Sequence, residues 1–273
     1  MNAPSQAAAF DEPIDQYEAG EFAEKMAFEK LKEHLTDEYW RLNNLYKIKD
    51  KQGKVSTFRM NAAQEYMYKN MHWRNLILKA RQLGFTTFID LFILDRCLFT
   101  PKTHPVRAGI IAHHMDDAKA IFDEKIKFPY ENLDPQIRAI IGAETDARTE
   151  MKFSNNSTIR VSTSFRSGTL QYLHVSEFGK IAAKYPEKAK EIISGAFEAV
   201  PLDGMIFVES TAEGREGAFY NMVIEAKKLL DGHKKLTPLD FKFFFFPWWK
   251  DPTYVLDAGG VLITTEDLNY FGS

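Results

Sequence analysis

The sequence predicts an α/β fold in which helices cover both faces of a mainly parallel central sheet, giving a three-layer sandwich. Two observations lead to this prediction. Short apolar runs of strand length alternate with helical patterns along most of the chain. Three of these runs end directly in small, hydroxyl-bearing or charged residues, and ligands of open α/β sheets bind at such strand ends.

Composition sets further limits. The chain has 273 residues, of which 45% are hydrophobic, and a formal net charge of −3, which argues against a uniformly basic nucleic-acid binder but allows a local basic groove. The single cysteine, Cys97, cannot form an internal disulfide, so we expect a reducing compartment. The N-terminus does not suit a signal peptide, and no apolar run approaches the roughly 20 residues of a membrane span.

The first part of the chain is expected to form a helix and a hairpin that act as an N-terminal lid on the core. The spacing of apolar residues predicts a helix over 17–35. The turn-forming residues at 51–54 predict a hairpin over 44–60, and a helix over 61–70 follows it.

The core elements follow from apolar runs and their breaks. The run at 76–78 predicts a buried strand, and the apolar segment 88–99, stopped by Pro101, predicts a buried helix. The other expected elements are strands at 106–112, 171–175, 205–208 and 241–246, helices at 116–128 and 217–230, and a hairpin over 151–163. We expect an N-terminal helical segment at 1–43, a core at 44–235, and a last core strand with a tail or linker at 236–273.

The segment 79–87, with the sequence KARQLGFTT, joins the first buried strand to the buried helix. A strand, a glycine-containing turn and a helix N-terminus together form an anion site, because backbone N–H groups point outward and the helix dipole favours negative charge. The sequence therefore favours a P-loop NTPase of the RecA-like (ASCE) type. The alternative is an ordinary strand–turn–helix with a surface lysine.

This loop departs from the usual pattern G-x-x-x-x-G-K-[ST]. Aligning Gly84 and Thr86 with that pattern puts Phe85 where the lysine belongs. We expect Lys79 to reach the phosphates from the other end of the loop, with Arg81 as a second cation. The loop residues expected to contact the nucleotide are Lys79, Arg81, Gln82, Gly84, Thr86 and Thr87.

The second signal is the strand ending Tyr172-Leu173-His174-Val175-Ser176-Glu177. In nucleotide hydrolases one core strand ends in an Asp that holds Mg²⁺ and often in a Glu that activates water. We expect this strand to lie beside the loop strand. Ser176 occupies the Asp position here, and Glu177 is the candidate catalytic carboxylate. The candidate Mg²⁺ ligands, partly through water, are Thr86, Ser176 and Glu177. The alternative is a strand that ends in two polar residues without a function.

The third signal is the run Met205–Val208, which continues into Glu209-Ser210-Thr211-Ala212. Hydroxyl side chains at the end of a central strand lie beside the ligand crevice. Ser210 and Thr211 are therefore candidates to contact the γ-phosphate or the attacking water. The alternative is that they cap the following helix.

These motifs in this order resemble the large subunit of tailed-phage terminases, the DNA-packaging motor. The family's R-Q-x-G loop is matched at 81–84, its F-x-x-N-x-x-Q segment at 58–64, its R-x-G element at 166–168 and its S/T-rich coupling segment at 210–212. The resemblance covers about residues 44–260, and no single motif is specific, whereas the ordered set is.

The resemblance implies an ATPase that uses ATP and Mg²⁺, with Gln64 reading the adenine edge and Arg166 as an arginine finger that acts on a neighbouring subunit. Arg148 and Arg215 are alternatives for that arginine. It implies double-stranded DNA, the portal protein and the small terminase subunit as partners. It also implies a homo-oligomeric ring, a pentamer, when active, located in the host cytoplasm at the procapsid portal, with no membrane contact.

The chain also departs from the family. The family's nuclease domain is not expected here, because only Asp257, Glu266 and Asp267 are acidic after Pro252, so we expect a motor half or a single-domain relative without nuclease activity. The alternatives to a packaging ATPase are a helicase-like translocase and a degenerate nucleotide-binding module that does not hydrolyse ATP.

Overall fold

One mainly parallel sheet runs through the part of the chain that a computed structural model describes, residues 25–26, 28–50, 52–165, 168–255, 259–260 and 262–271. Its eight strands lie in the order β10-β3-β9-β8-β4-β7-β6-β5. Every pair from β10 to β7 is parallel, and β6 and β5 are antiparallel at the other edge. The strands are β3 (Arg74–Lys79), β4 (Arg107–Ile111), β5 (Ala143–Ala147), β6 (Glu150–Phe153), β7 (Thr158–Ser162), β8 (Tyr172–Val175), β9 (Met205–Ser210) and β10 (Lys242–Phe246).

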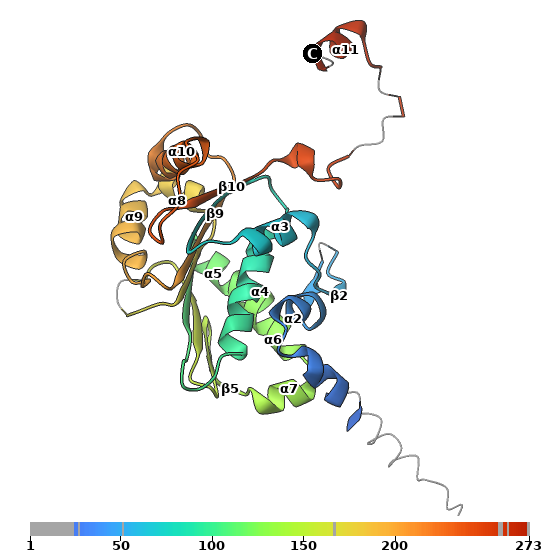
Figure 1. The fold of residues 1–273 in the computed structure, drawn as a ribbon, viewed down its shortest axis with the longest axis vertical. Coiled ribbons are helices and arrows are strands. Elements are labelled where there is room, and N and C mark those ends of the chain that lie inside the picture. The colour runs from blue at the N-terminus through green and yellow to red at the C-terminus, as the bar shows by residue number, and fades with distance from the viewer. Residues whose placement is uncertain are drawn as a thin grey trace, which may run out of the picture.

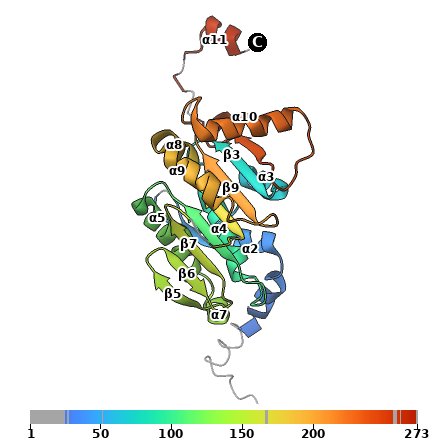
Figure 2. The same ribbon diagram turned by 90° about the vertical axis from the view of Figure 1, so that its left-hand side faces the viewer.

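Helices cover both faces of this sheet, which confirms the predicted three-layer α/β sandwich (Figure 1). Successive strand residues point to opposite faces, so Ile77 packs with the α4 side whereas Leu76 packs with the α8 side. Figure 2 shows α8, α9 and α10 gathered over β3 and β9 on the second face. The helices are α2 (Glu38–Asn44), α3 (Ala62–Asn70), α4 (Phe85–Leu98), α5 (Met115–Ile121), α6 (Phe128–Glu131), α7 (Pro135–Ile140), α8 (Phe178–Lys184), α9 (Pro186–Glu191), α10 (Gly217–Asp231) and α11 (Thr265–Phe271).

The N-terminal elements brace α4. Residues 28–34 are helical, whereas most of the rest of the helix expected at 17–35 lies outside the described residues. The expected hairpin is confirmed as β1 (Lys47–Lys49) paired antiparallel with β2 (Val55–Thr57). The sequence did not predict α2, whose Leu42 is buried in the same core cluster as the apolar side chains of α4.

A buried charged cluster fixes α2 against α4. Arg41 donates to Asp95 through Nε at 3.0 Å and Nη2 at 2.6 Å, and its Nη1 donates to the Leu35 carbonyl at 2.6 Å. The Tyr46 hydroxyl donates to the same Asp95 carboxylate at 2.6 Å. Because both charges are buried, this bidentate geometry is what makes their burial tolerable.

The middle of the chain shows two differences from expectation. The helix expected at 116–128 is confirmed, but it includes a π-helical stretch (Phe122–Lys127) between α5 and α6. The expected hairpin over 151–163 is formed by β6 and β7, and β5 extends it with a strand that the sequence did not predict. Short π and 3₁₀ stretches also occur at Ile192–Ala196 and Trp248–Lys250.

The order of the central strands corrects one expectation. The strand that pairs with β3 is β9, and β8 lies one place further out. The carboxyl ends of β3, β9 and β8 still meet at one edge because all three are parallel. Among the described residues, no helix has the length and apolar character needed to cross a bilayer.

Candidate active site

The loop between β3 and α4 has the form of an anion site. Gly84 is the N-cap of α4 in the left-handed conformation (φ 73°), and Gln82 also has a positive φ of 61°. No side chain caps the first turn of α4, and that turn contains no acidic residue. Its backbone N–H groups and the positive end of the helix dipole are therefore available to an anion.

Gln64 holds this loop from behind. It forms a capping box with Asn61 at the start of α3, and its Nε2 donates to the carbonyl of Gly84 at 2.9 Å. A Cβ at position 84 would lie 2.7 Å from that same Nε2, so this close approach requires glycine. The Tyr254 hydroxyl donates to the carbonyl of Arg81 from the C-terminal side. In this arrangement the Gln64 amide is used by the loop and does not line the cavity in front of it.

Phe85, at the usual lysine position, belongs to the core. Its side chain is fully buried, and its ring centroid lies 4.4 Å from that of Phe246 on β10. A lysine at this position would replace an aromatic contact between α4 and the edge strand. The cation near the loop therefore has to come from another residue.

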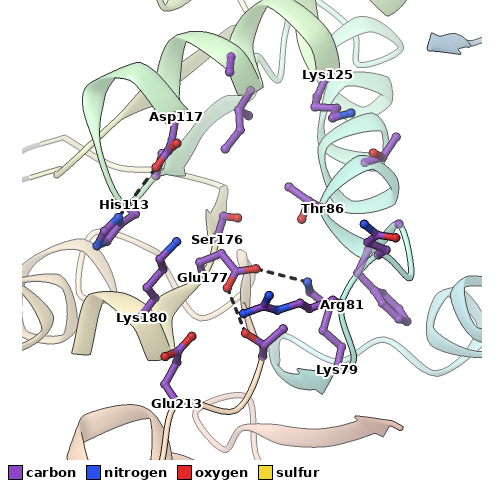
Figure 3. A pocket seen from close by; sticks show the side chains of 18 residues that line it. Lys79, Arg81, Thr86, His113, Asp117, Lys125, Ser176, Glu177, Lys180 and Glu213 are labelled. Carbon is purple, nitrogen blue, oxygen red and sulfur yellow. Dashed lines mark hydrogen bonds and ion pairs between the residues drawn. The ribbon is translucent and has the colours of Figure 1, made fainter. Parts of the chain in front are cut away.

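Lys79 is that cation, and it lies at the last position of β3. Its Nζ is 3.1 Å from Glu209 Oε2 and 3.5 Å from Glu177 Oε1. Burial lowers the pKa of Lys79, but the carboxylates of Glu209 and Glu177 outweigh burial and raise that pKa above its usual value. Figure 3 shows Lys79 and Glu177 facing one another across the floor of the cavity.

A cavity of about 620 Å³ opens in front of the loop. It brings together most of the residues that the sequence singled out. Those residues are Lys79, Arg81, Gln82, Gly84, Thr86, Thr87, Ser176, Glu177 and Thr211. Gln64 and Ser210 are not among its lining residues, and Arg166 lies outside the described part of the chain.

The backbone presents Glu177 to the cavity. Glu177 is the N-cap of α8 and has a left-handed conformation, with φ 53°, which is rare for a residue that is not glycine. Its side chain is one-third exposed, and Thr211 Oγ1 donates to its Oε2 at 3.5 Å. The strained backbone thus places a carboxylate between Lys79 and Thr211 at the mouth of the cavity.

Ser210, the last residue of β9, and Thr211, which follows it, lie on opposite faces of the sheet. Thr211 lines the cavity, whereas Ser210 is fully buried on the α8 side. A Cβ on Gly179 would lie 2.7 Å from Ser210 Oγ, so α8 closes directly over this side chain. Of the two residues that we expected near the γ-phosphate, Thr211 therefore lines the cavity and Ser210 does not.

The sequence analysis missed the residue with the most polar contacts here, Glu209 on β9. Its side chain is fully buried, and its Oε1 accepts hydrogen bonds from Thr86 Oγ1 at 2.5 Å and Ser176 Oγ at 3.0 Å. Behind it, His174 Nε2 is 3.5 Å from the same Oε1, and His174 Nδ1 is 2.7 Å from Asp90 of α4. The signal that could have found Glu209 is the alternation along β9, which puts 207, 209 and 211 on one face.

The charges of this buried group are fixed by their neighbours. Burial raises the pKa of Glu209, but Lys79 and His174 outweigh burial and hold that pKa at about 2. Burial lowers the pKa of His174, but the flanking carboxylates of Asp90 and Glu209 outweigh it and raise that pKa to about 9. Near pH 7 Glu209 is therefore an anion and His174 a cation.

The far wall of the cavity carries His113, Asp117 and Lys125 from the segment after β4, and Lys180 projects from α8 (Figure 3). His114 is the N-cap of α5, and Asp116 lies in the first turn of that helix and pairs with Lys119 at 3.1 Å. Within the described ranges no three His, Cys, Asp or Glu side chains are grouped as metal ligands.

Neither protein-family models nor curated proteins match this chain. Solved structures do. The Thermus phage P74-26 large terminase ATPase domain matches with a TM-score of 0.50 and 14% identity over 74% of this chain and 91% of that one.

The large terminase of bacteriophage HK97 matches with a TM-score of 0.54 and 16% identity over 72% of this chain. The match covers 42% of the HK97 protein, so this chain corresponds to less than half of that protein's length. At identities this low the likeness concerns architecture. The chain has the fold of a phage large-terminase ATPase domain.

Proposed function

We propose that this chain is the ATPase motor domain of a phage terminase large subunit, which hydrolyses ATP to drive double-stranded DNA into a procapsid. One observation carries the proposal. Lys79 Nζ, at the end of β3, and the Glu177 carboxylate, at the N-terminus of α8, lie 3.5 Å apart in a cavity at the N-terminus of α4. The fold shared with a terminase ATPase domain supports it.

The triphosphate would be bound by the loop and the first turn of α4. The N–H groups of the first turn of α4, together with the Lys79 ammonium and the Arg81 guanidinium, would neutralise its negative charge. Gln82, Gly84 and Thr87 line the same space. We assign Gln64 to the support of the loop, because its amide already donates to the Gly84 carbonyl.

Glu177 would activate water for attack on the γ-phosphate. A carboxylate that accepts a proton from a positioned water is the usual base in phosphoryl-transfer hydrolases. Thr211 donates to one of its oxygens, and Lys79 pairs with the other. When phosphate draws Lys79 away, Glu177 would be left free to accept that proton.

The residues present fit Mg²⁺. Thr86 and Ser176 offer hydroxyl oxygens and Glu177 offers a carboxylate, which suits an ion that keeps several waters and binds mainly through substrate phosphates. When bound, Mg²⁺ would withdraw charge from the phosphate oxygens. The chain's own part is to orient these oxygens around the β- and γ-phosphates.

Assembly follows from the same proposal. A homo-oligomeric ring, a pentamer, would let Arg166 of one subunit reach the γ-phosphate of its neighbour. The portal protein and the small terminase subunit would be its partners in the host cytoplasm. Such an arginine is worth about 10³–10⁵ in turnover, so an unassembled chain would be slow.

Phosphate release, measured with and without double-stranded DNA at several protein concentrations, tests the proposal. We expect Glu177→Gln to lower turnover by roughly 10²-fold or more while ATP binding is kept. Glu187→Gln is the matched control, because Glu187 is a highly exposed residue of α9 whose carboxylate pairs with Lys190 of the same helix.

Two outcomes would favour the alternatives. ATP binding without phosphate release by the unmodified chain at every concentration would indicate a degenerate nucleotide-binding module. Strand separation on a forked duplex would indicate a helicase-like translocase. Equal turnover in Glu177→Gln and Glu187→Gln would reject the role of Glu177.

A further inference from the structure

Glu209 stands at the centre of the polar contacts behind the cavity. Its two oxygens contact groups from three elements, namely Lys79 of β3, Thr86 of α4 and Ser176 after β8. No other carboxylate described by the structure has a hydrogen bond from both Thr86 and Ser176, two of the hydroxyl residues that line the cavity. Figure 3 shows the side chains of Thr86 and Ser176 directed toward the same space from opposite sides.

The direction of these two hydrogen bonds is fixed by charge. Glu209 Oε2 lies 3.1 Å from the Lys79 ammonium, so Glu209 is an ion-paired carboxylate whose other oxygen, Oε1, can only accept. Each hydroxyl has one proton, and Thr86 and Ser176 both use it to donate a hydrogen bond to Glu209. The oxygen lone pairs of both side chains are then left for a group on the cavity side, and such a group must be a donor or a cation.

We propose that Glu209 is a positioning carboxylate, which turns the Thr86 and Ser176 oxygens into ligands for the divalent cation that accompanies the nucleotide. It would also supply, from one layer deeper, the negative charge that an aspartate would supply at position 176. This inference rests on the proposed function, because it requires that a metal–nucleotide complex occupies the cavity.

The surroundings of Glu209 suit this role better than that of a simple ion pair with Lys79. A pair with Lys79 alone would need one carboxylate oxygen, whereas the Oε1 atom is committed to the two hydroxyls. His174, held by Asp90 at 2.7 Å, has its Nε2 3.5 Å from that same oxygen and does not line the cavity. Partners of this kind fix the orientation of metal ligands in many proteins.

Binding of Mn²⁺ in the presence of the non-hydrolysable analogue AMP-PNP, followed by the electron paramagnetic resonance signal of free Mn²⁺, tests the inference without relying on turnover. We expect Glu209→Gln to weaken Mn²⁺ binding by about 10–100-fold, because the amide can donate to the hydroxyl oxygens and occupy their lone pairs. AMP-PNP binding in EDTA is expected to persist. Glu187→Gln serves as the matched control.

A second variant moves the carboxylate from position 209 to position 176. In the double variant Ser176→Asp, Glu209→Gln the carboxylate returns to position 176, and we expect it to recover most of the lost Mn²⁺ affinity. A carboxylate with a merely structural role at 209 would give no such recovery. Mn²⁺ affinity in Glu209→Gln equal to that of the unmodified chain would overturn the inference and leave the proposed ATPase standing.

Folding of Glu209→Gln is checked by circular dichroism, because it leaves Lys79 with one carboxylate fewer. If that variant does not fold, Ser176→Ala decides, since it keeps Glu209 and its ion pairs. We expect about tenfold weaker Mn²⁺ binding for Ser176→Ala, and an unchanged affinity would overturn the inference. An unmodified chain that binds no AMP-PNP would overturn both the inference and the proposed function.

Discussion

Helix α4 contributes to two buried charged clusters that differ in one respect. The closed cluster, Arg41, Tyr46 and Asp95, has every buried side-chain polar atom hydrogen-bonded. The open cluster, Lys79, Asp90, His174 and Glu209, leaves Asp90 Oδ2 and His174 Nε2 without a hydrogen bond, whereas Glu209 Oε2 has the Lys79 ammonium 3.1 Å away. Asp90 and Asp95 are only five residues apart on the same helix.

This difference separates a structural role from a functional one. A fully satisfied buried network fixes one arrangement, whereas unsatisfied buried groups are costly and usually have another reason to exist. The closed cluster joins α2 to α4 far from the cavity lining. The open cluster lies behind the cavity, and its Lys79 and the two hydroxyl residues that contact Glu209, Thr86 and Ser176, line that cavity.

The two largest expected effects come from one substitution in each cluster, of which one lowers stability and the other lowers turnover. Asp95→Ala should lower the free energy of unfolding by about 3–5 kcal/mol, because Arg41 is left as an unpaired buried charge. Turnover per folded molecule should be unchanged. Lys79→Met should lower turnover by about 10²–10³-fold, since it removes a charge aimed at the phosphates.

Urea unfolding and phosphate release, both measured at low temperature, check this pair. Lys79→Met should lose less stability than Asp95→Ala, because Glu209 keeps Thr86, Ser176 and His174 as neighbours. If Asp95→Ala lost turnover as strongly as Lys79→Met while folded, the two clusters would not differ in role.

Apolar runs in the sequence were sufficient to predict most strands of the sheet and the position of the loop. The strands that bury both faces, such as β3 and β9, give continuous apolar runs that need no tertiary information to recognise. The short elements α2, α7 and β5 carry weak periodic signals and depend on contacts with α4 and β6. They could not be predicted from local pattern alone.

The site could be predicted in part for the same reason. Lys79, Thr86 and Glu177 lie at chain positions that a strand–loop–helix pattern identifies, and the cavity brings them together. Glu209 was missed because the sequence predicted a strand over 205–208 only, whereas β9 continues to Ser210. The insertion of β9 between β3 and β8 depends on long-range pairing, which the local sequence does not specify.

The next prediction uses pH to separate the clusters. The folded pKa of His174, about 9, exceeds its ordinary value of 6.5, so its contribution to stability is complete below pH 6.5 and is lost as pH rises through 9. The full shift corresponds to up to about 3 kcal/mol. In the closed cluster the pKa values of Arg41 and Tyr46 are raised further above this window, and burial also raises the pKa of Asp95 above its ordinary value.

Urea unfolding of the unmodified chain and of His174→Asn at pH 6.5 and pH 9 measures this effect. We expect the unmodified chain to lose stability across the window and the variant to lose clearly less. At the acid end the sign is opposite for Glu209, whose stabilising contribution is present above pH 4.5 and lost as pH falls toward 2. An equal pH dependence in both proteins would show that His174 is not held as a cation.

The smallest expected effect concerns the neighbouring hydroxyl side chains of Ser210 and Thr211 at the end of β9. Thr211→Val keeps the side-chain shape but removes the 3.5 Å hydrogen bond to Glu177, so turnover should fall by roughly 2–10-fold, as for one weak hydrogen bond. Ser210→Ala removes a buried hydroxyl whose Oγ has no hydrogen bond, so turnover should be unchanged and stability equal or slightly higher. Steady-state phosphate release and urea unfolding measure both. A larger loss of turnover in Ser210→Ala than in Thr211→Val would mean that Ser210, and not Thr211, faces the reacting phosphate, and the assignment of the two faces of β9 would have to be reversed.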